Sequence, residues 1–136
     1  MPHDEQDLRL SVQHLARRIR SMQADEDVTE GQRTALFALD KLGAQTLGSL
    51  SEHQQVTPPS MNRTVNALVE AGLVTRETAS DDARKVTIDL SDDGRSFIKE
   101  TRRRRDAWFT KKLARLTPDE REIMYAAGRI MRELAE

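Results

Sequence analysis

The chain has 136 residues, of which 37% are hydrophobic and 33% are charged, and it carries a formal net charge of -1 and no cysteine. This length accommodates one domain, or one domain with an interaction arm. Without cysteine, disulfides, thiolate catalysis, Cys-ligated zinc and thiol-based redox sensing are excluded. The N-terminal segment is acidic and lacks the apolar core of a secretory signal, and no stretch approaches the roughly 20 apolar residues of a membrane span. We therefore expect a cytoplasmic protein with no membrane partner.

The first predicted helix has a narrow apolar seam. Its apolar residues are spaced four, three, four and three positions apart, at Leu8, Val12, Leu15, Ile19 and Met22. A helix that packs into the core of a single domain usually carries a broader stripe, whereas this heptad-like spacing is typical of packing against a partner helix.

A capping box predicts where the second helix begins. The Thr29 side chain can accept a hydrogen bond from the amide three residues on, and Gln32 can return one to the Thr29 amide. The helix then carries Leu36 and Leu39 on an apolar face. Gly43 is its predicted end, because glycine readily adopts the backbone conformation of a helix C-terminus.

Two short helices follow, joined by about four residues, which is typical of a helix-turn-helix. Thr46 is the predicted cap of the first helix and Thr57 of the second. Pro58 suits the first turn of the second helix, where no amide hydrogen is needed. That helix continues along an apolar face to Gly72, where it is expected to end.

After Gly72 the spacing of the hydrophobic residues changes to every second position, as in a strand. Residues 73–78 and 85–90 are predicted strands, in which Val86 and Ile88 alternate with polar residues. The connector, residues 79–84, is polar and longer than a tight two-residue turn. A β-hairpin with a protruding tip is therefore expected directly after the helix-turn-helix.

Two further helices are predicted near the C-terminus. Ser91 caps a long helix that runs to about residue 116, and Thr117, Pro118 and Glu120 mark the start of the last helix. The middle of the chain cannot cover the apolar seams of the first and last helices, so we expect them to pair with each other and with a second copy. The candidate dimerisation residues are Leu8, Val12, Leu15, Ile123, Ile130 and Leu134.

These elements predict a mainly α fold with a small β-hairpin wing. The fold class is a winged helix-turn-helix whose terminal helices form a dimerisation domain. We assign residues 31–91 to the winged helix-turn-helix region and residues 1–30 and 92–136 to the helical dimerisation region.

The second helix of the helix-turn-helix has a polar face that suits the major groove of DNA. Its candidate DNA-binding residues are Pro59, Ser60, Asn62, Arg63 and Asn66. Serine and asparagine hydrogen-bond to base edges, and arginine reaches a phosphate or a guanine. The alternative interpretation is an ordinary solvated helix face, because these residue types are common on protein surfaces.

The tip of the hairpin carries a second candidate DNA contact. Arg84 and Lys85 lie on its C-terminal side, and Asp82 precedes Arg84 by two residues. A narrow minor groove concentrates negative potential and attracts a guanidinium, which Asp82 would orient. The alternative is a solvated turn in which Asp82 and Arg84 form a surface ion pair of little energetic value.

Several sequence blocks occur in a set order along the chain. They are Leu47-Gly48-Ser49-Leu50, Val56-Thr57-Pro58-Pro59-Ser60-Met61-Asn62-Arg63, Leu68-Val69-Glu70-Ala71-Gly72-Leu73-Val74-Thr75-Arg76, Asp82-Ala83-Arg84 and Val86-Thr87-Ile88-Asp89-Leu90-Ser91. In this order the blocks resemble the MarR family of bacterial winged helix-turn-helix regulators. The resemblance extends over nearly the whole chain.

The resemblance implies an obligate homodimer whose terminal helices interlock. Each subunit would place a recognition helix, residues 58–71, in a major groove of a pseudo-palindromic operator in double-stranded DNA, and its wing in the flanking minor groove. The Asp-x-Arg signature of the family's wing corresponds to Asp82 and Arg84. Ala83 departs from the pattern, because a second arginine often stands there, so the wing is expected to hold the DNA backbone less tightly.

The resemblance also implies repression that a small aromatic or anionic ligand relieves. Such a ligand would bind between the dimerisation helices and the DNA-reading region. The candidate ligand residues are Arg18, Met22, Trp108 and Phe109. The alternative is that the tryptophan and methionine belong to the core, as they usually do on a helix. No metal and no cofactor are expected.

The charge balance leaves a second function open. The sequence pI is about 6.3, whereas nucleic-acid-binding domains typically exceed about 9. Between residues 58 and 90 acidic side chains slightly outnumber basic ones, and the basic surplus lies within residues 95–115. We expect moderate DNA affinity with a modest salt dependence, and the alternative function is a winged-helix protein-interaction module without DNA binding.

An enzyme is not expected. The chain has three scattered histidines, no cysteine and no glycine-rich phosphate loop. None of these places a base or nucleophile beside a partner. The acidic pair Asp81-Asp82 is adjacent in sequence on a turn, where two carboxylates are poorly placed for shared acid–base work.

Overall fold

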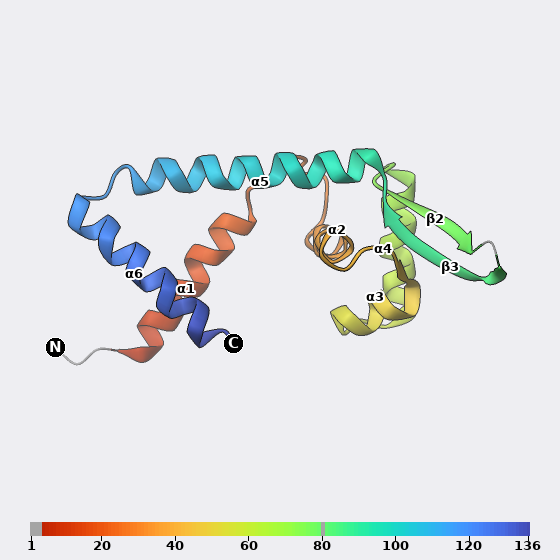
Figure 1. The fold of residues 1–136 in the computed structure, drawn as a ribbon, viewed down its shortest axis with the longest axis horizontal. Helices are drawn as coiled ribbons and strands as arrows, with labels where there is room; N and C mark the ends of the chain where they lie inside the picture. The colour runs from red at the N-terminus through yellow and green to blue at the C-terminus, as the bar shows by residue number, and fades with distance from the viewer. Residues whose placement is uncertain (1–3, 80) are drawn as a thin grey trace. The chain divides into compact units, whose positions relative to one another are not determined.

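The computed structural model describes residues 4–79 and 81–136, except for the side chains of residues 79 and 82–84. Within these residues the chain forms helices and one small antiparallel sheet (Figure 1). The elements in chain order are α1 (Glu5–Arg20), α2 (Glu30–Leu42), β1 (Gln45–Thr46), α3 (Leu47–Gln54), α4 (Pro58–Glu70), β2 (Val74–Ala79), β3 (Asp82–Leu90), α5 (Asp92–Leu113) and α6 (Pro118–Leu134). The mainly α fold with a small β wing is therefore confirmed. None of the helices in the described part of the chain has the length and apolar character to cross a membrane.

The chain divides into two compact units. The winged unit comprises Gln23–Arg102, and the terminal unit comprises Met1–Met22 together with Arg103–Glu136. These bounds differ from those of the regions predicted above, because residues on both flanks are buried in the winged unit. Val28 is buried before α2, and the Thr101 hydroxyl of α5 accepts a hydrogen bond from the Ala24 amide at 3.0 Å.

The winged unit is built around one aliphatic core. Side chains from α2, α3, α4, the sheet and the start of α5 meet in it, and the most deeply buried are Leu36, Leu39, Leu50, Met61, Leu68, Ile88 and Ile98. On α4 the buried residues recur at helical spacing, as Met61, Val65 and Leu68. The opposite face of α4 is consequently turned away from the core.

The predicted helix starts are confirmed by their capping bonds. The Thr57 side chain accepts from the Ser60 amide at 3.3 Å, and Pro58 begins α4. Thr29 and Thr117 each form a complete capping box. In the second box the hydrogen bonds from Thr117 lower the pKa of the Glu120 carboxyl, because they favour its ionised form.

The sheet has the strand order β1-β3-β2, with all neighbours antiparallel. The hairpin pairs Val74 with Leu90 and Arg76 with Ile88, so the predicted strands are present and extend further toward the tip. The short strand β1 pairs with Thr87 and Ile88 of β3. The strand β1 was not predicted, because two residues are too few to show an alternating pattern.

Two hydrogen bonds tie the segment that follows α4 to the start of α5. The Ser91 hydroxyl donates to the Gly72 carbonyl at 2.6 Å, and the Ser91 amide donates to the Leu73 carbonyl at 3.0 Å. The Gly94 amide in turn donates to the Ser91 hydroxyl at 3.0 Å, which confirms Ser91 as the predicted cap of α5. Gly94 packs so closely that an added Cβ would overlap the Leu73 carbonyl oxygen.

We expect Gly94→Ala to lower the free energy of unfolding by about 1–3 kcal/mol, the usual cost of forcing extra atoms into a packed site. Urea denaturation followed by circular dichroism measures this. Gly48→Ala is the matched control, because Gly48 lies in α3 with open space around it. Its expected effect is a gain of about 0.5–1 kcal/mol, and an equal response of the two variants would contradict the close packing at Gly94.

Candidate nucleic-acid interface

The outward face of α4 carries the residues predicted to contact DNA. Pro59, Asn62, Arg63 and Asn66 are exposed, and Ser60 is half-buried. They belong to one helix whose other side is fixed in the core, so the fold holds them together as a polar surface. This polar surface of α4 offers hydroxyl, amide and guanidinium groups, which are the groups that hydrogen-bond to base edges and phosphates.

Arg76 on β2 is part of the same surface, although sequence analysis did not single it out for this role. Its Nη2 donates to Oδ1 of Asn66 at 2.6 Å and to Oδ1 of Asn62 at 3.3 Å. The signal that could have found it is the strand period, because Arg76 follows the buried Val74 by two residues and so projects from the same face of the strand.

The hairpin carries the predicted wing residues. Figure 1 shows β2 and β3 extending beyond α4 toward the tip. The side chains of Asp82 and Arg84 lie outside the described residues. Lys85, on β3, is exposed. The structure therefore places Lys85 on the wing. The ion pair and the DNA contact predicted for Asp82 and Arg84 remain predictions.

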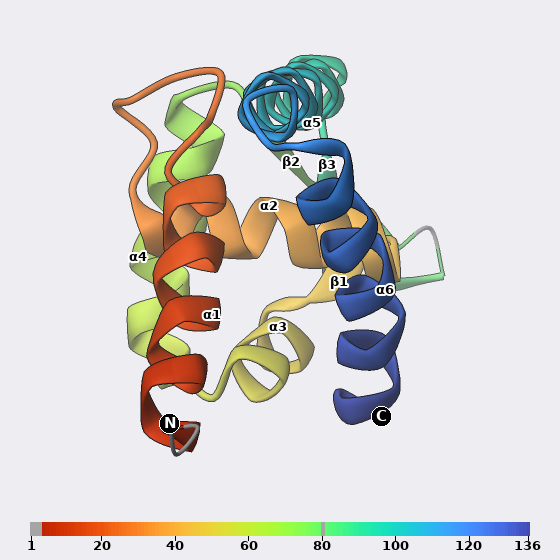
Figure 2. The same ribbon diagram turned by 90° about the vertical axis from the view of Figure 1, so that its left-hand side faces the viewer.

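In the terminal unit, α1 and α6 bury no residue, and both carry apolar side chains. Figure 2 shows these two helices standing apart. The space between them contains a groove of about 600 Å³ with apolar walls from α1, the end of α5 and α6. Its lining includes Leu8, Val12, Leu15, Phe109, Met124 and Met131.

The candidate dimerisation residues fall into two sets. Leu8, Val12 and Leu15 of α1 line the groove. The candidate residues of α6 are not among those that line the groove, and they are strongly exposed. Their relative exposures are 66% for Ile123, 57% for Ile130 and 80% for Leu134. The apolar surface of α6 therefore extends beyond the residues that line the groove.

The candidate ligand residues are only partly brought together. The Arg18 guanidinium lies 5.8 Å from the centre of the Trp108 ring, and the Lys112 ammonium lies 5.5 Å from the same ring. These are cation–π contacts. Phe109 lines the groove between α1 and α6, and the Met22 carbonyl accepts a hydrogen bond from Nε of Arg105 at 3.1 Å.

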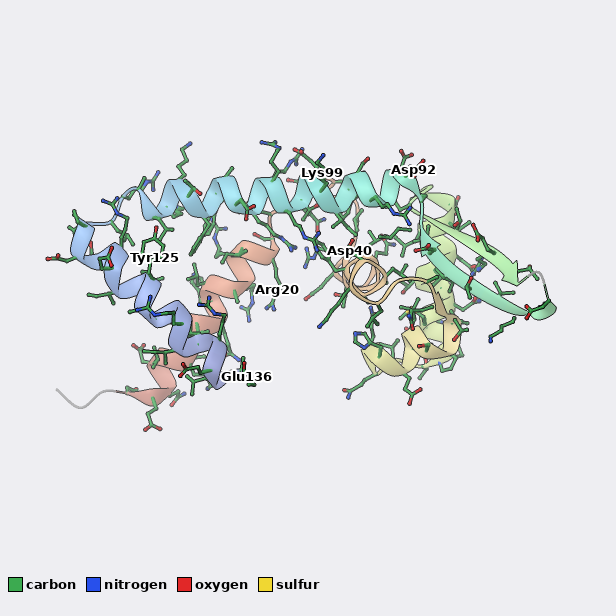
Figure 3. The ribbon with its side chains drawn as sticks, viewed as in Figure 1. Arg20, Asp40, Asp92, Lys99, Tyr125 and Glu136 are labelled. Carbon is green, nitrogen blue, oxygen red and sulfur yellow. The ribbon has the colours of Figure 1, made fainter. Side chains whose placement is uncertain are left out.

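Two arginines of the basic run 102–105 make contacts within their own units. In the winged unit, Nη2 of Arg102 lies 2.7 Å from Oδ2 of Asp40, which is labelled on α2 in Figure 3. In the terminal unit, Arg105 also donates to the Arg20 carbonyl at 3.3 Å, next to the C-terminus of α1, where unpaired carbonyls attract a cation. Both side chains therefore stabilise the fold locally.

The chain is similar in sequence to known transcriptional regulators. The family model that matches it, over residues 28–86, is that of the MarR family. An HTH-type transcriptional regulator of Mycobacterium leprae is 36% identical over 130 residues, which cover 96% of this chain and 91% of that protein. The chain belongs to the MarR family.

As a MarR-family protein, the chain is a DNA-binding transcriptional regulator and not an enzyme. This membership favours DNA binding over the alternative of a protein-interaction module. Among the described residues, no group of three or more His, Cys, Asp and Glu side chains is arranged to hold a metal ion.

One further relative and one solved structure extend the comparison. The HTH-type transcriptional repressor MdtR of Bacillus subtilis is 27% identical over 134 residues, which cover 96% of this chain and 84% of that protein. The structure of a mutant of MepR from S. aureus, bound to an oligodeoxyribonucleotide, matches with a TM-score of 0.76 and 19% identity over 99% of this chain and 100% of that one. The second likeness shows a shared fold.

Proposed function

We propose that two copies of this chain form a repressor that binds a pseudo-palindromic operator. The observation that carries the proposal is the polar surface of α4, held outward by the buried face of the same helix. The repressor name of the relative MdtR and the oligonucleotide bound to the MepR mutant support it. Because the proposed partner is chromosomal DNA, the site of action is the cytoplasm.

In this proposal α4 is the recognition helix and enters the major groove. Ser60, Asn62 and Asn66 hydrogen-bond to base edges, and Arg63 contacts a phosphate. Pro59 lies in the first turn of α4 and has no amide hydrogen, so its ring offers the DNA an apolar contact. Base contacts determine which sequence is bound, whereas the phosphate contacts determine how tightly any duplex is bound.

The hairpin acts as a wing in the minor groove. Arg84 and Lys85 supply the positive charge at the tip, and Asp82 orients Arg84. The negative potential of a narrow minor groove provides the attraction. Because acidic side chains slightly outnumber basic ones between residues 58 and 90, this pair contributes a large share of the electrostatic attraction.

Dimerisation through the terminal units follows from their unburied apolar surface. Isolated apolar side chains on a surface need no explanation, but α1 and α6 together expose several large ones, some of which line the groove between the two helices. A second copy would bury this set. The two recognition helices would then lie about 34 Å apart, one turn of the double helix, as half-site spacing requires.

A small aromatic or anionic ligand relieves repression in this proposal. Trp108 offers a ring face, and Arg18 and Lys112 place two cations against it. An aromatic carboxylate would find stacking and charge pairing at this position. Its binding would change the arrangement of the helices that hold the dimer together.

The role of the recognition helix is tested by its base preference. After in vitro selection of bound DNA, we expect Asn66→Ala to lower the preference for the operator over a variant operator by about tenfold, because one base contact is lost. Arg63→Ala should weaken binding to operator and random duplex by the same factor, since a phosphate contact carries no sequence information. Fluorescence anisotropy measures both. If Asn66→Ala instead weakened binding to operator and random DNA equally, Asn66 would be assigned to a phosphate contact and not to a base.

The wing is tested by Arg84→Ala. We expect weaker operator binding with an unchanged oligomeric state, because the substitution removes a minor-groove cation far in sequence from the terminal helices. Gel-shift titration and gel filtration report the two properties. Operator affinity that stays within a factor of about two would show that the wing makes no minor-groove contact.

The dimer is tested by Ile130→Asp, which places a charge in the exposed apolar surface of α6. We expect monomers in analytical ultracentrifugation, and operator affinity reduced by about a hundredfold or more, because the second half-site is no longer bound by a linked copy. Arg129→Asp introduces the same carboxylate at an exposed neighbouring position on the polar side of α6 and should leave the dimer intact. A monomeric Ile130→Asp variant that binds the operator as tightly as the unsubstituted protein would refute this role of the terminal helices.

A further inference from the structure

Arg76 connects the wing to the recognition helix. It projects from β2 on the same side as the buried Val74 and pairs across the hairpin with the buried Ile88. The aliphatic core ends at this point, so the Arg76 side chain continues along the exposed edge of α4. There its Nη2 reaches Asn66 at 2.6 Å and Asn62 at 3.3 Å, residues one helical turn apart.

The chemistry of the guanidinium determines how these two amides are turned. Arginine has donors and no acceptor, so the amide atom that faces Arg76 must be the oxygen in each case. One nitrogen, Nη2, carries two hydrogens, and the two carbonyl oxygens accept them. The amide nitrogens of Asn62 and Asn66 are therefore directed away from β2.

We propose that Arg76 is a positioning residue that determines the sequence specificity of this regulator. With their oxygens held by Arg76, Asn62 and Asn66 face the major groove as hydrogen-bond donors. Donors match the acceptor atoms of base edges, namely N7 and O6 of guanine, O4 of thymine and N7 of adenine. Recognition of adenine by two bonds needs the oxygen and the nitrogen of the amide side by side at the base, and Arg76 disfavours that orientation.

The energetic basis is preorganisation. A free asparagine on a helix surface samples both amide orientations, and binding must then select one. Charge-assisted hydrogen bonds from a guanidinium are stronger than neutral ones, so Arg76 selects the orientation before DNA arrives. The inference rests on the proposed role of α4 as the recognition helix.

The experiment uses the full-length protein and the operator obtained by in vitro selection. Fluorescence anisotropy measures dissociation constants for the operator, a set of single-base variants and a random duplex. We expect Arg76→Ala to lower the discrimination at the base pairs facing Asn62 and Asn66 by about tenfold. Binding to the random duplex should change by less than about threefold, because Arg76 acts through the asparagines and contributes only its charge to other DNA.

Lys99→Ala is the control for the loss of one positive charge. Lys99 is exposed on α5 in the same unit (Figure 3). We expect this variant to keep the discrimination of the unsubstituted protein. Thermal unfolding of Arg76→Ala should match that of the unsubstituted protein, because the side chain is exposed and lies outside the core.

The decisive measurement is made in the Asn62→Ala, Asn66→Ala background. If Arg76 acts through these amides, adding Arg76→Ala to that background leaves the discrimination unchanged. A further uniform loss on all duplexes, with the salt dependence reduced by about one phosphate contact, would assign Arg76 to the DNA backbone and overturn the inference. Failure of the proposed function is distinct, since the unsubstituted protein would then show no preference for any selected sequence.

Discussion

The burial of one face of α4 is the constraint on which the reading surface depends. Met61, Val65 and Leu68 enter a core shared with α2, the sheet and the start of α5. A helix with one side buried can present only its other side, and its rotation about its own axis is set by the packing. The junction at Ser91 and Gly94 fixes the end of the same helix to α5. The orientation and position of the polar surface are thus set by buried residues and by the junction with α5, and not by the residues proposed to contact DNA.

The terminal unit presents the opposite situation. Its helices α1 and α6 are amphipathic, but none of their residues is fully buried within one chain. Hydrophobic surface of this extent favours association with a complementary surface, and a second copy offers the same groove and the same exposed α6 residues. The core that folds the winged unit and the apolar surface proposed to pair two protomers therefore lie in different parts of the chain.

In the proposed function, the charge distribution makes discrimination between DNA sequences depend more on hydrogen bonds than on net charge. The reading region is not basic, and Arg102 and Arg105 of the basic run contact Asp40 and the end of α1. Phosphate neutralisation supplies most non-specific affinity, so a regulator with few such groups needs its base contacts to be well ordered. The pairing of Arg76 with Asn62 and Asn66 fits that requirement.

The sequence by itself determined the order of the helices, their capped starts at Thr29, Thr57 and Thr117, the hairpin and the family. These features depend on residues within three or four positions of one another, or on a set order of short blocks, and both are visible in one dimension. Only the tertiary structure decided which of the apolar residues of α1 and α6 line a groove, and that β1 joins the sheet. It alone placed Arg76 against Asn66 and Asn62, which lie 10 and 14 residues earlier in the chain. The strand period gives only the face of β2 from which Arg76 projects. Its contacts with the asparagines join a strand to a helix across the edge of the core, and they arise only once the core has set the two elements side by side.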